Sequence, residues 1–403
     1  MSWEFRKLNE IVLVKSGKRL PKGHNFVLDP TNHPYIRARD IKNGKINIEE
    51  PVYINNNTFN IISRYTVRES DVVITIVGAN VGDIAFIDSK HDGANLTENA
   101  AKLIPKDRNT LSPKFLKYSL FGDVQKSKFQ QIAMAAAQPK LGLYKIKDFE
   151  ISIPKIETQK RIADILIAYD DLIENSLKRI KLLEQAAQNI YKEWFINLHF
   201  PGHENTPINK ETGLPEGWEK VLAKEYFDFK RGIEVGSKNY VKEESENTIP
   251  FIRVGSIGSR DTDIFTDISL VKDKILKLSD VVVSMDGSIG IIGYGLVGAY
   301  STGLRKVAAK SDKYGDGFIF CLLKSEYIQN TIRAYAKGST ILHASSSIEH
   351  MSFNNAPSEI TYQFNSIIEP IYNQMLNLNM LNQKLKAARD ILLPRLMNRT
   401  IEV

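Results

Sequence analysis

The residues of this 403-residue chain that could do chemistry are basic and polar side chains in short, loop-like stretches. Arg and Lys neutralise phosphates, and Arg, Gln, Ser and Thr also hydrogen-bond to base edges. The candidates of the first half are Lys15, Lys18, Arg19, Lys22, Arg37, Arg39, Gln138 and Lys140. Those of the second half are Arg231, Lys238, Arg253, Arg260, Lys337, Ser339, Thr340 and His343. The two groups predict a DNA-contacting surface in each half of the chain.

Two of these arginines sit in a predicted strand, Tyr35–Ile41. Arg37 and Arg39 alternate there, so their side chains should share one face of the strand. Arg37 and Arg253 occupy the same place in two similar stretches, PYIRARD and PFIRVGS. An internal ion pair is therefore the competing interpretation for both.

Signatures of catalysis and of bound cofactors are missing. The glycine-rich stretches VGANVGD and MDGSIGIIGYGLVG lack the GxxxxGK[ST] pattern and a strand–GxGxxG–helix setting, so they predict tight turns. No GxSxG, HExxH, Asn-Pro-Pro-Phe or Asp-Pro-Pro-Tyr sequence occurs. His199 and His203 are separated by Pro201, and Cys321 is the only cysteine, which excludes an intramolecular disulfide. We predict no catalytic residue, no metal site and no cofactor held by this chain.

The basic residues are unevenly distributed. The whole chain carries +7, while residues 1–156 hold 24 Lys and Arg against 16 Asp and Glu, a net +8. A basic block predicts a polyanionic partner, with nucleic acid first, although a surface kept basic for solubility is the alternative. The apolar runs are too short to span a bilayer and the N-terminus lacks a signal-peptide pattern, so we expect a cytoplasmic protein.

Two long helices are predicted to organise the chain. In Ile156–Leu198, apolar residues recur at steps of three and four without Gly or Pro, which predicts a rod of about 60 Å. From Phe364 onward, an a/d heptad pattern runs with Asn382 and Arg389 as polar exceptions, and Pro370 is expected in its first turn. The simplest prediction is that the apolar stripes of the two helices pack on each other as a coiled coil. Packing of each helix on its own domain is the alternative.

The segments before the two helices repeat one another. Trp3-Glu4 matches Trp218-Glu219, and Ser70-Asp71 matches Ser279-Asp280. Further matches in the same order are Gly17 with Gly232, Gly78 and Gly82 with Gly287 and Gly290, Phe115 with Phe318, and Pro154 with Pro357. Ordered matches over this length indicate duplication of a whole unit, domain plus helix.

Each repeated domain reads as short strands with a few helices. The predicted strands are Tyr35–Ile41, Val72–Val77, Ile84–Ile87, Ala101–Ile104, Phe251–Val254, Val281–Met285 and Ile289–Val297, and the predicted helices are Pro113–Ser127 and Gly317–Lys337. The fold class is therefore α+β. The predicted divisions are a domain at 1–156, a long helix at 157–198, a linker at 199–217, a second domain at 218–357 and a second long helix at 358–403.

These features together resemble the specificity subunit of Type I restriction–modification systems, over the whole chain. The sequences that carry the resemblance are LPEGW at 214–218, PYIRARDI with PFIRVGSI, SDVVITIVGANVGDIAFI with SDVVVSMDGSIGIIGYG, and the junction AAAQPKLGLYKIKDFEISIPKIETQKRIADIL. The second junction, KGSTILHASSSIEHMSFNNAPSEITYQFNSII, lacks the Gln-Pro-Lys sequence. The residue-level match is therefore weaker in the second unit.

The resemblance implies a division of labour. Two target-recognition domains, held apart by an antiparallel helix pair, would read the halves of a split, asymmetric double-stranded DNA sequence. The helices would also dock two modification subunits, which use S-adenosylmethionine to methylate adenine, and two motor–nuclease restriction subunits, which use ATP and Mg. This chain would supply specificity without chemistry. An orphan or stand-alone DNA-binding regulator and a coiled-coil protein scaffold are the alternatives.

Overall fold

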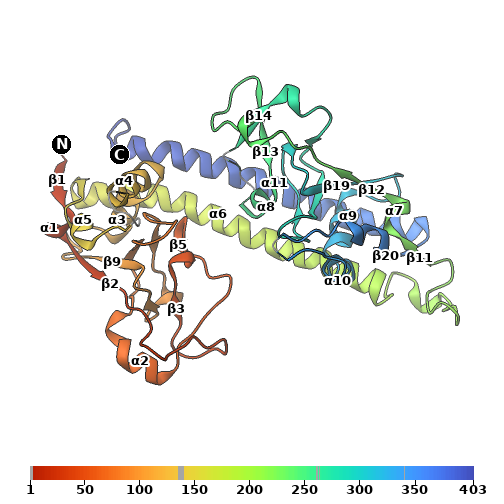
Figure 1. Cartoon of the computed structure of the whole chain (residues 1–403), viewed down its shortest axis with the longest axis horizontal. Coiled ribbons are helices and arrows are strands. Elements are labelled where there is room, and N and C mark those ends of the chain that lie inside the picture. The colour runs from red at the N-terminus through yellow and green to blue at the C-terminus, as the bar shows by residue number, and fades with distance from the viewer. Residues whose placement is uncertain (1–2, 135–139, 260–261, 263, 340) are drawn as a thin grey trace. The chain divides into compact units, whose positions relative to one another are not determined.

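The chain forms two compact units, each built from a globular domain and parts of both long helices. The structure is a computed structural model that describes residues 3–134, 140–259, 262, 264–339 and 341–403 (Figure 1). The first unit contains residues 1–172 and 385–403, and the second contains residues 173–384. No helix of the described residues is long and apolar enough to cross a membrane.

The first unit is built around a six-stranded sheet of order β2-β9-β6-β7-β5-β4. Its strands are β2 (Val12–Ser16), β9 (Ala100–Pro105), β6 (Val72–Thr75), β7 (Ile84–Phe86), β5 (Gly44–Ile46) and β4 (Ile41–Lys42). Two further pairs flank it, β3 (Tyr35–Ile36) parallel to β8 (Asn95–Leu96) and β1 (Glu4–Lys7) antiparallel to β10 (Glu150–Ile153). The helices of this domain are α1 (Leu8–Ile11), α2 (Asn56–Ile62), α3 (Pro113–Leu120), α4 (Asp123–Ala133) and α5 (Leu143–Lys147).

The second unit repeats this plan. Its sheet has the order β12-β19-β16-β17, which reproduces β2-β9-β6-β7, and comprises β12 (Phe227–Arg231), β19 (Leu304–Ala309), β16 (Val281–Ser284) and β17 (Ile292–Gly293). The other strands are β11 (Glu219–Leu222) with β20 (Ser352–Asn355), and β13 (Thr248–Ile252) with β14 (Phe265–Asp267), β18 (Gly298–Tyr300) and β15 (Ile275–Leu276). The helices are α7 (Ala223–Tyr226), α8 (Val254–Ser259), α9 (Asp316–Lys324) and α10 (Glu326–Ala334). The common strand order confirms the predicted duplication.

Two glycines that match in the repeat, Gly17 and Gly232, occupy positions where no larger residue fits. A Cβ at Gly17 would lie 2.1 Å from the carbonyl oxygen of Thr97, and one at Gly232 would lie 2.2 Å from that of Tyr300. Neither backbone oxygen can move without disturbing a strand, so only glycine fits.

We therefore expect Gly17→Ala and Gly232→Ala each to lower the free energy of unfolding by about 1–3 kcal/mol, the usual cost of overpacking. Thermal and urea unfolding of the purified chain measures this. Gly255→Ala is the control, because nothing lies within 4 Å of a Cβ there. Equal effects at all three positions would contradict the close-approach explanation.

The first predicted long helix is confirmed. Helix α6 spans Ile156–Tyr191 and continues as a π-helical turn over Lys192–Ile196. Its buried face includes Ile173, Ile180 and Ala187, as predicted. Leu172 and Leu177, which the predicted stripe also contained, are 55% and 46% exposed.

The second long helix differs from the prediction at its start. Helix α11 spans Ser358–Met397, so Pro370 lies in its interior and not in its first turn. A proline there removes the hydrogen bond to the carbonyl of Ser366. The heptad positions Phe364, Ile368 and Met375 are fully buried, which offsets that loss.

Four predictions of shorter elements were wrong in length. The strand predicted at Tyr35–Ile41 ends at Ile36, and the strand predicted at Phe251–Val254 ends at Ile252, where α8 follows. The two predicted helices are each divided, at Gly122 with a φ of 104° and at Ser325 in an extended conformation. Helix propensity alone does not reveal such breaks, because packing of both segments on the sheet fixes them.

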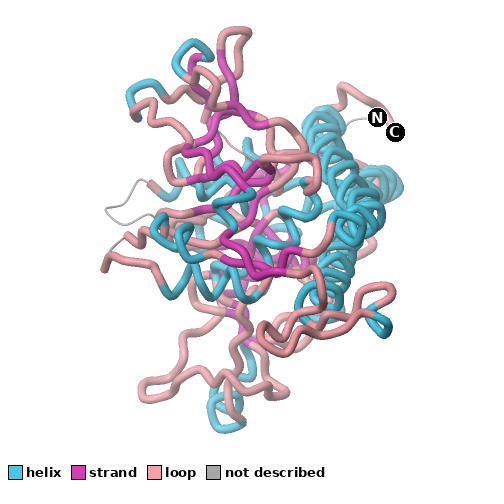
Figure 2. Tube along the Cα trace, turned by 90° about the vertical axis from the view of Figure 1, so that its right-hand side faces the viewer, coloured by secondary structure: helices cyan, strands magenta, loops and turns pink. Residues whose placement is uncertain are grey.

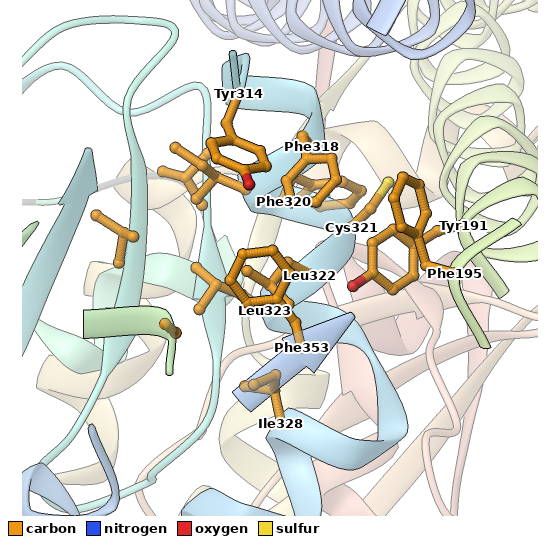
Figure 3. Packing of buried hydrophobic residues seen from close by; sticks show 14 of the residues in the cluster. Tyr191, Phe195, Tyr314, Phe318, Phe320, Cys321, Leu322, Leu323, Ile328 and Phe353 are labelled. Carbon is orange, nitrogen blue, oxygen red and sulfur yellow. The ribbon is translucent and has the colours of Figure 1, made fainter. Parts of the chain in front are cut away.

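An aromatic core fills the second unit. Phe318 of α9 packs edge-on against Phe195, with ring centroids 5.2 Å apart (Figure 3). It packs in the same way against Phe364, with ring centroids 5.7 Å apart. The segment predicted as a linker, 199–217, lies in this unit and buries Phe200 and Leu214 in the same core. Figure 2 draws the helices in cyan and the strands in magenta. In each unit one core joins the sheet to a long helix, because Val72 clusters with Ile162 in the first unit and Val281 clusters with Phe364 in the second.

Two carboxyl groups at the start of α9 predict a pH effect. Burial raises the pKa of both Glu369 and Asp316, and the nearby Asp316 charge raises that of Glu369 further. A raised folded-state pKa gives stability that is full below the unfolded pKa and is lost as pH rises through the folded value. Glu369→Gln, which keeps an acceptor for the Gly317 N–H, should raise the unfolding free energy at pH 7 by about 1 kcal/mol and flatten the pH profile. Urea unfolding between pH 4 and 8 measures this, and an unchanged profile would contradict it.

Candidate nucleic-acid interface

Loops from distant parts of the first domain meet at one end of its sheet. Strands β2 and β6 both finish beside the start of β9, since each pairs with β9 in an antiparallel manner. The Gly17 N–H donates to the Ala100 carbonyl at 3.0 Å, and the Ile76 N–H donates to that of Asn99 at 2.8 Å. Leu141 N–H donates to the Ile76 carbonyl at 2.9 Å. We call residues 16–19, 76–78, 97–100 and 140–141 the first sheet end.

The second domain forms the same arrangement. The Gly232 N–H donates to the Leu304 carbonyl at 3.3 Å, and the Met285 N–H donates to that of Gly303 at 2.8 Å. The loop after α10 docks there, because the Gly287 N–H donates to the Leu342 carbonyl at 2.8 Å. We call residues 231–233, 285–287, 301–304 and the described part of 337–344 the second sheet end.

Several predicted contact residues of the first domain gather at the first sheet end. Lys18, Arg19 and Lys140 lie within it and are exposed, and Lys15 is exposed on the adjoining part of β2. Lys22 and Arg39 lie farther away, in the turn around Pro21 and in the 3-10 helix Ala38–Asp40. Gln138 falls outside the described residues.

The prediction that Arg37 and Arg39 share a strand face is wrong. The Asp40 carboxylate accepts from the backbone N–H of Arg37 at 2.8 Å and from its guanidinium at 3.0 Å, and this turns the chain into a 3-10 helix. Arg37 also donates to the Glu50 carbonyl, and its side chain is only 18% exposed. Arg37 thus forms the internal ion pair that was the competing interpretation.

Of the other cations at or near the first sheet end, the arginines form ion pairs with carboxylates and three lysines do not. Arg19 pairs with Glu98 at 2.8 Å, and Arg39 pairs with Glu50 at 2.8 Å. Partial burial acts to raise the pKa of Glu98, but the Arg19 guanidinium brings it below its usual value. Lys15, Lys18 and Lys22 make no ion pair with any described carboxylate, so their charges remain available to a polyanion.

The second domain places its predicted residues in a similar way. Arg231 lies within the second sheet end, where Lys337 and His343 pair through both backbone N–H groups; Ser339 lies in the exposed loop between them. His343 Nδ1 lies 2.7 Å from the Asp286 carboxylate. Lys238 lies outside, in the 3-10 helix Ser237–Asn239, and the Arg253 guanidinium lies 5.5 Å from the centre of the Tyr240 ring. Arg260 and Thr340 fall outside the described residues.

A residue that the sequence analysis missed holds the second sheet end together. Arg305 is 7% exposed, and its guanidinium donates to the Thr302 carbonyl at 2.6 Å and to Ser345 Oγ at 2.7 Å. Burial lowers the pKa of Arg305. Its place inside a strand, β19, gave no signal of this loop-joining role.

A cavity of about 600 Å³ in the first unit is a poor phosphate site. It lies between the start of α4 and the end of α11, and Asp83, Asp123 and Asp390 line it. Its cations are neutralised already, because Lys126 pairs with Asp83 at 2.6 Å and Arg389 pairs with Asp390. Among the described residues, no cluster of His, Cys, Asp and Glu could hold a metal ion. The two sheet ends are therefore the candidate nucleic-acid interface.

Comparisons with known proteins agree with a DNA-recognition role. Residues 1–185 and 215–387 match the family described as type I restriction modification DNA specificity domain. The MjaIX specificity subunit of a type I restriction enzyme from Methanocaldococcus jannaschii is 25% identical over 98% of this chain and 92% of its own length. The HindI specificity subunit of a type I restriction enzyme from Haemophilus influenzae is 20% identical over 83% of this chain and 87% of its own length. The crystal structure of a type I S subunit from M. genitalium has the same fold, with a TM-score of 0.56 and 15% identity over 98% of this chain and 96% of that one.

Proposed function

Because this chain belongs to the type I restriction–modification specificity family, we propose that its two domains read the two halves of a split, asymmetric DNA sequence. In this proposal each sheet end approaches the major groove, where base pairs present distinct donors and acceptors. Exposed lysines at its margin would neutralise phosphates and fix the register. The chain itself would perform no reaction.

The observation that carries this proposal is the pairing of one backbone frame with two different sets of side chains. Gly17 and Gly232 hold equivalent loops against equivalent strands. The residues beside them differ, with the exposed Lys18 and Arg19 in one domain and the half-buried Ile233 and exposed Glu234 in the other. A common frame with different side chains suits two different half-sites.

We further propose that α6 and α11 form an antiparallel coiled coil that spaces the two domains. Within the first unit, Asp170 pairs with Arg389, and within the second, the rings of Phe195 and Phe364 lie 4.9 Å apart. The separations agree along both helices, because 195 − 170 = 25 and 389 − 364 = 25. One antiparallel register would therefore accommodate both contacts. A stiff spacer of this kind would fix the gap between half-sites, which a flexible linker would not.

The same helices would dock the partner subunits. On α6, Leu172, Leu177 and Leu182 are 46–66% exposed, and on α11 Leu381 and Ile391 are 45% and 55% exposed. Exposed apolar side chains on helices suit contacts with partner helices. We propose two modification subunits, which would supply S-adenosylmethionine, and two restriction subunits, which would supply ATP and Mg.

Genome-wide adenine methylation tests the proposal. Cells that carry the genes of the presumed partner subunits are compared with and without this gene. A split motif that is methylated only when the gene is present supports the role, and exchange of residues 1–156 should then change one half of the motif only. Absence of any gene-dependent motif would overturn it in favour of a stand-alone regulator or a scaffold.

A further inference from the structure

Asp170 of α6 joins three elements of the first unit through one buried carboxylate. Its Oδ2 accepts from Lys117 Nζ at 2.6 Å and from the Tyr118 hydroxyl at 2.7 Å, both on α3 of the globular domain. Its Oδ1 accepts from the Arg389 guanidinium of α11 at 2.7 Å. We call these four residues the Asp170 cluster. The cluster ties the first domain to both long helices.

The cluster is buried, and the surrounding donors favour the ionised form of its carboxylate. Asp170 is 5% exposed and Lys117 is 6% exposed. Burial acts to raise the pKa of Asp170, but the Lys117 ammonium and the other donors bring it below its usual value. Burial lowers the pKa of Lys117, although Asp170 opposes this. A carboxylate left without these donors would be very unfavourable here, so the three donors must keep their positions.

The second unit makes the equivalent contact without charge. Lys117 lies two residues after Phe115, and Phe320 lies two residues after the matching Phe318. Asp170 lies four residues after the buried Leu166, and Tyr372 lies four after the buried Ile368. Phe320 and Tyr372 pack with ring centroids 5.7 Å apart. The same position is thus ionic in one unit and aromatic in the other. The second unit has its own ion pair between the globular domain and α6, Lys324 with Glu184 at 2.6 Å, but these side chains are 30% and 21% exposed, whereas those of Lys117 and Asp170 are 8% and 7% exposed.

This difference has a geometric consequence. Packed rings tolerate small shifts, because dispersion contacts have little directional preference. Hydrogen bonds to a buried carboxylate weaken steeply when their angles or distances change. The buried ionic junction therefore restrains α3 on the two helices more tightly than apolar packing at the same position would.

We propose that the Asp170 cluster is a positioning device that sets how many base pairs the protein accepts between the two half-sites. It acts through the placement of the first domain on the helix pair and touches no DNA. The proposal rests on the proposed function. Neither the family match nor the similar proteins assign this role to the four residues.

The test measures methylation of plasmids that carry the methylated motif with its own gap and with one base pair added or removed. The intact complex is used, with its partner subunits co-expressed in cells. With Asp170→Asn, we expect the ratio of altered-gap to own-gap methylation to rise by about tenfold or more, a factor worth about 1.4 kcal/mol. Leu166→Ala is the matched control, because it weakens packing on the same helix in the same unit and leaves the cluster intact. Its ratio should stay at the wild-type value.

Lys117→Met is the second variant, for the case in which Asp170→Asn abolishes methylation through misfolding. It keeps the Asp170–Arg389 pair and should raise the same ratio. An unchanged ratio in the methylating variants, or an equal rise with Leu166→Ala, would overturn the positioning role. Failure of the proposed function would look different, because the wild-type protein would then direct no methylation at any gap.

Discussion

Insertion of one helical turn into both long helices is expected to move methylation from the original motif to one with a longer gap. Four residues inserted after Arg179 in α6 and after Met380 in α11 add about 6 Å to each helix. That length corresponds to about two base pairs of duplex DNA at 3.4 Å per step. Methylation at the original gap should fall by about 100-fold or more, since both domains can no longer reach their half-sites together. Sequencing of methylated adenines in the complemented strain measures both motifs.

The control for this prediction is insertion into α6 alone. In the proposed coiled coil the contacts Asp170–Arg389 and Phe195–Phe364 belong to one register, and a single insertion would make them incompatible with a straight pair. We therefore expect lost methylation at every gap, and not a shifted gap. If the double insertion keeps full methylation at the original gap, the helices do not act as the spacer.

The sequence predicted the features that depend on local periodicity and on repetition. The uninterrupted apolar stripe from Ile156 gave the first long helix almost to its last residue, because 36 residues of regular spacing leave few alternatives. Pairs such as Trp3 with Trp218 and Phe115 with Phe318 gave the duplication. The two tryptophans immediately precede equivalent strands and the two phenylalanines are buried in equivalent cores, so their order survives loop changes.

Features that depend on contacts distant in sequence were not predictable. Arg389 stood out as a polar break in the heptad pattern, but its partner Asp170 lies 219 residues away. Pro370 appeared to mark a helix start because proline is tolerated there, yet tertiary packing carries α11 back to Ser358. Among the candidate contact residues, spacing could not tell Arg37, which pairs with Asp40, from Lys18, which makes no ion pair with a described carboxylate.

The final prediction concerns the lysines of the first domain. Replacement of Lys15, Lys18 and Lys22 by Gln is expected to weaken DNA binding by the assembled complex by about 100-fold at low salt. These three side chains make no ion pair with a described carboxylate, so each can replace a counterion at a phosphate. The slope of log K against log salt should then become shallower by about 0.9 for each lysine that contacts a phosphate.

A matched triple variant separates location from net charge. Lys90, Lys114 and Lys155 are also exposed in the first unit but belong neither to the first sheet end nor to the adjoining β2 and the turn around Pro21. Their replacement by Gln removes the same charge and should leave the slope within about half a unit of the wild-type value. Equal slopes for the two triple variants would show that the +8 of residues 1–156 acts as a diffuse field. A shallower slope for the first triple alone would locate the phosphate contacts at Lys18 of the first sheet end and at Lys15 and Lys22 near it.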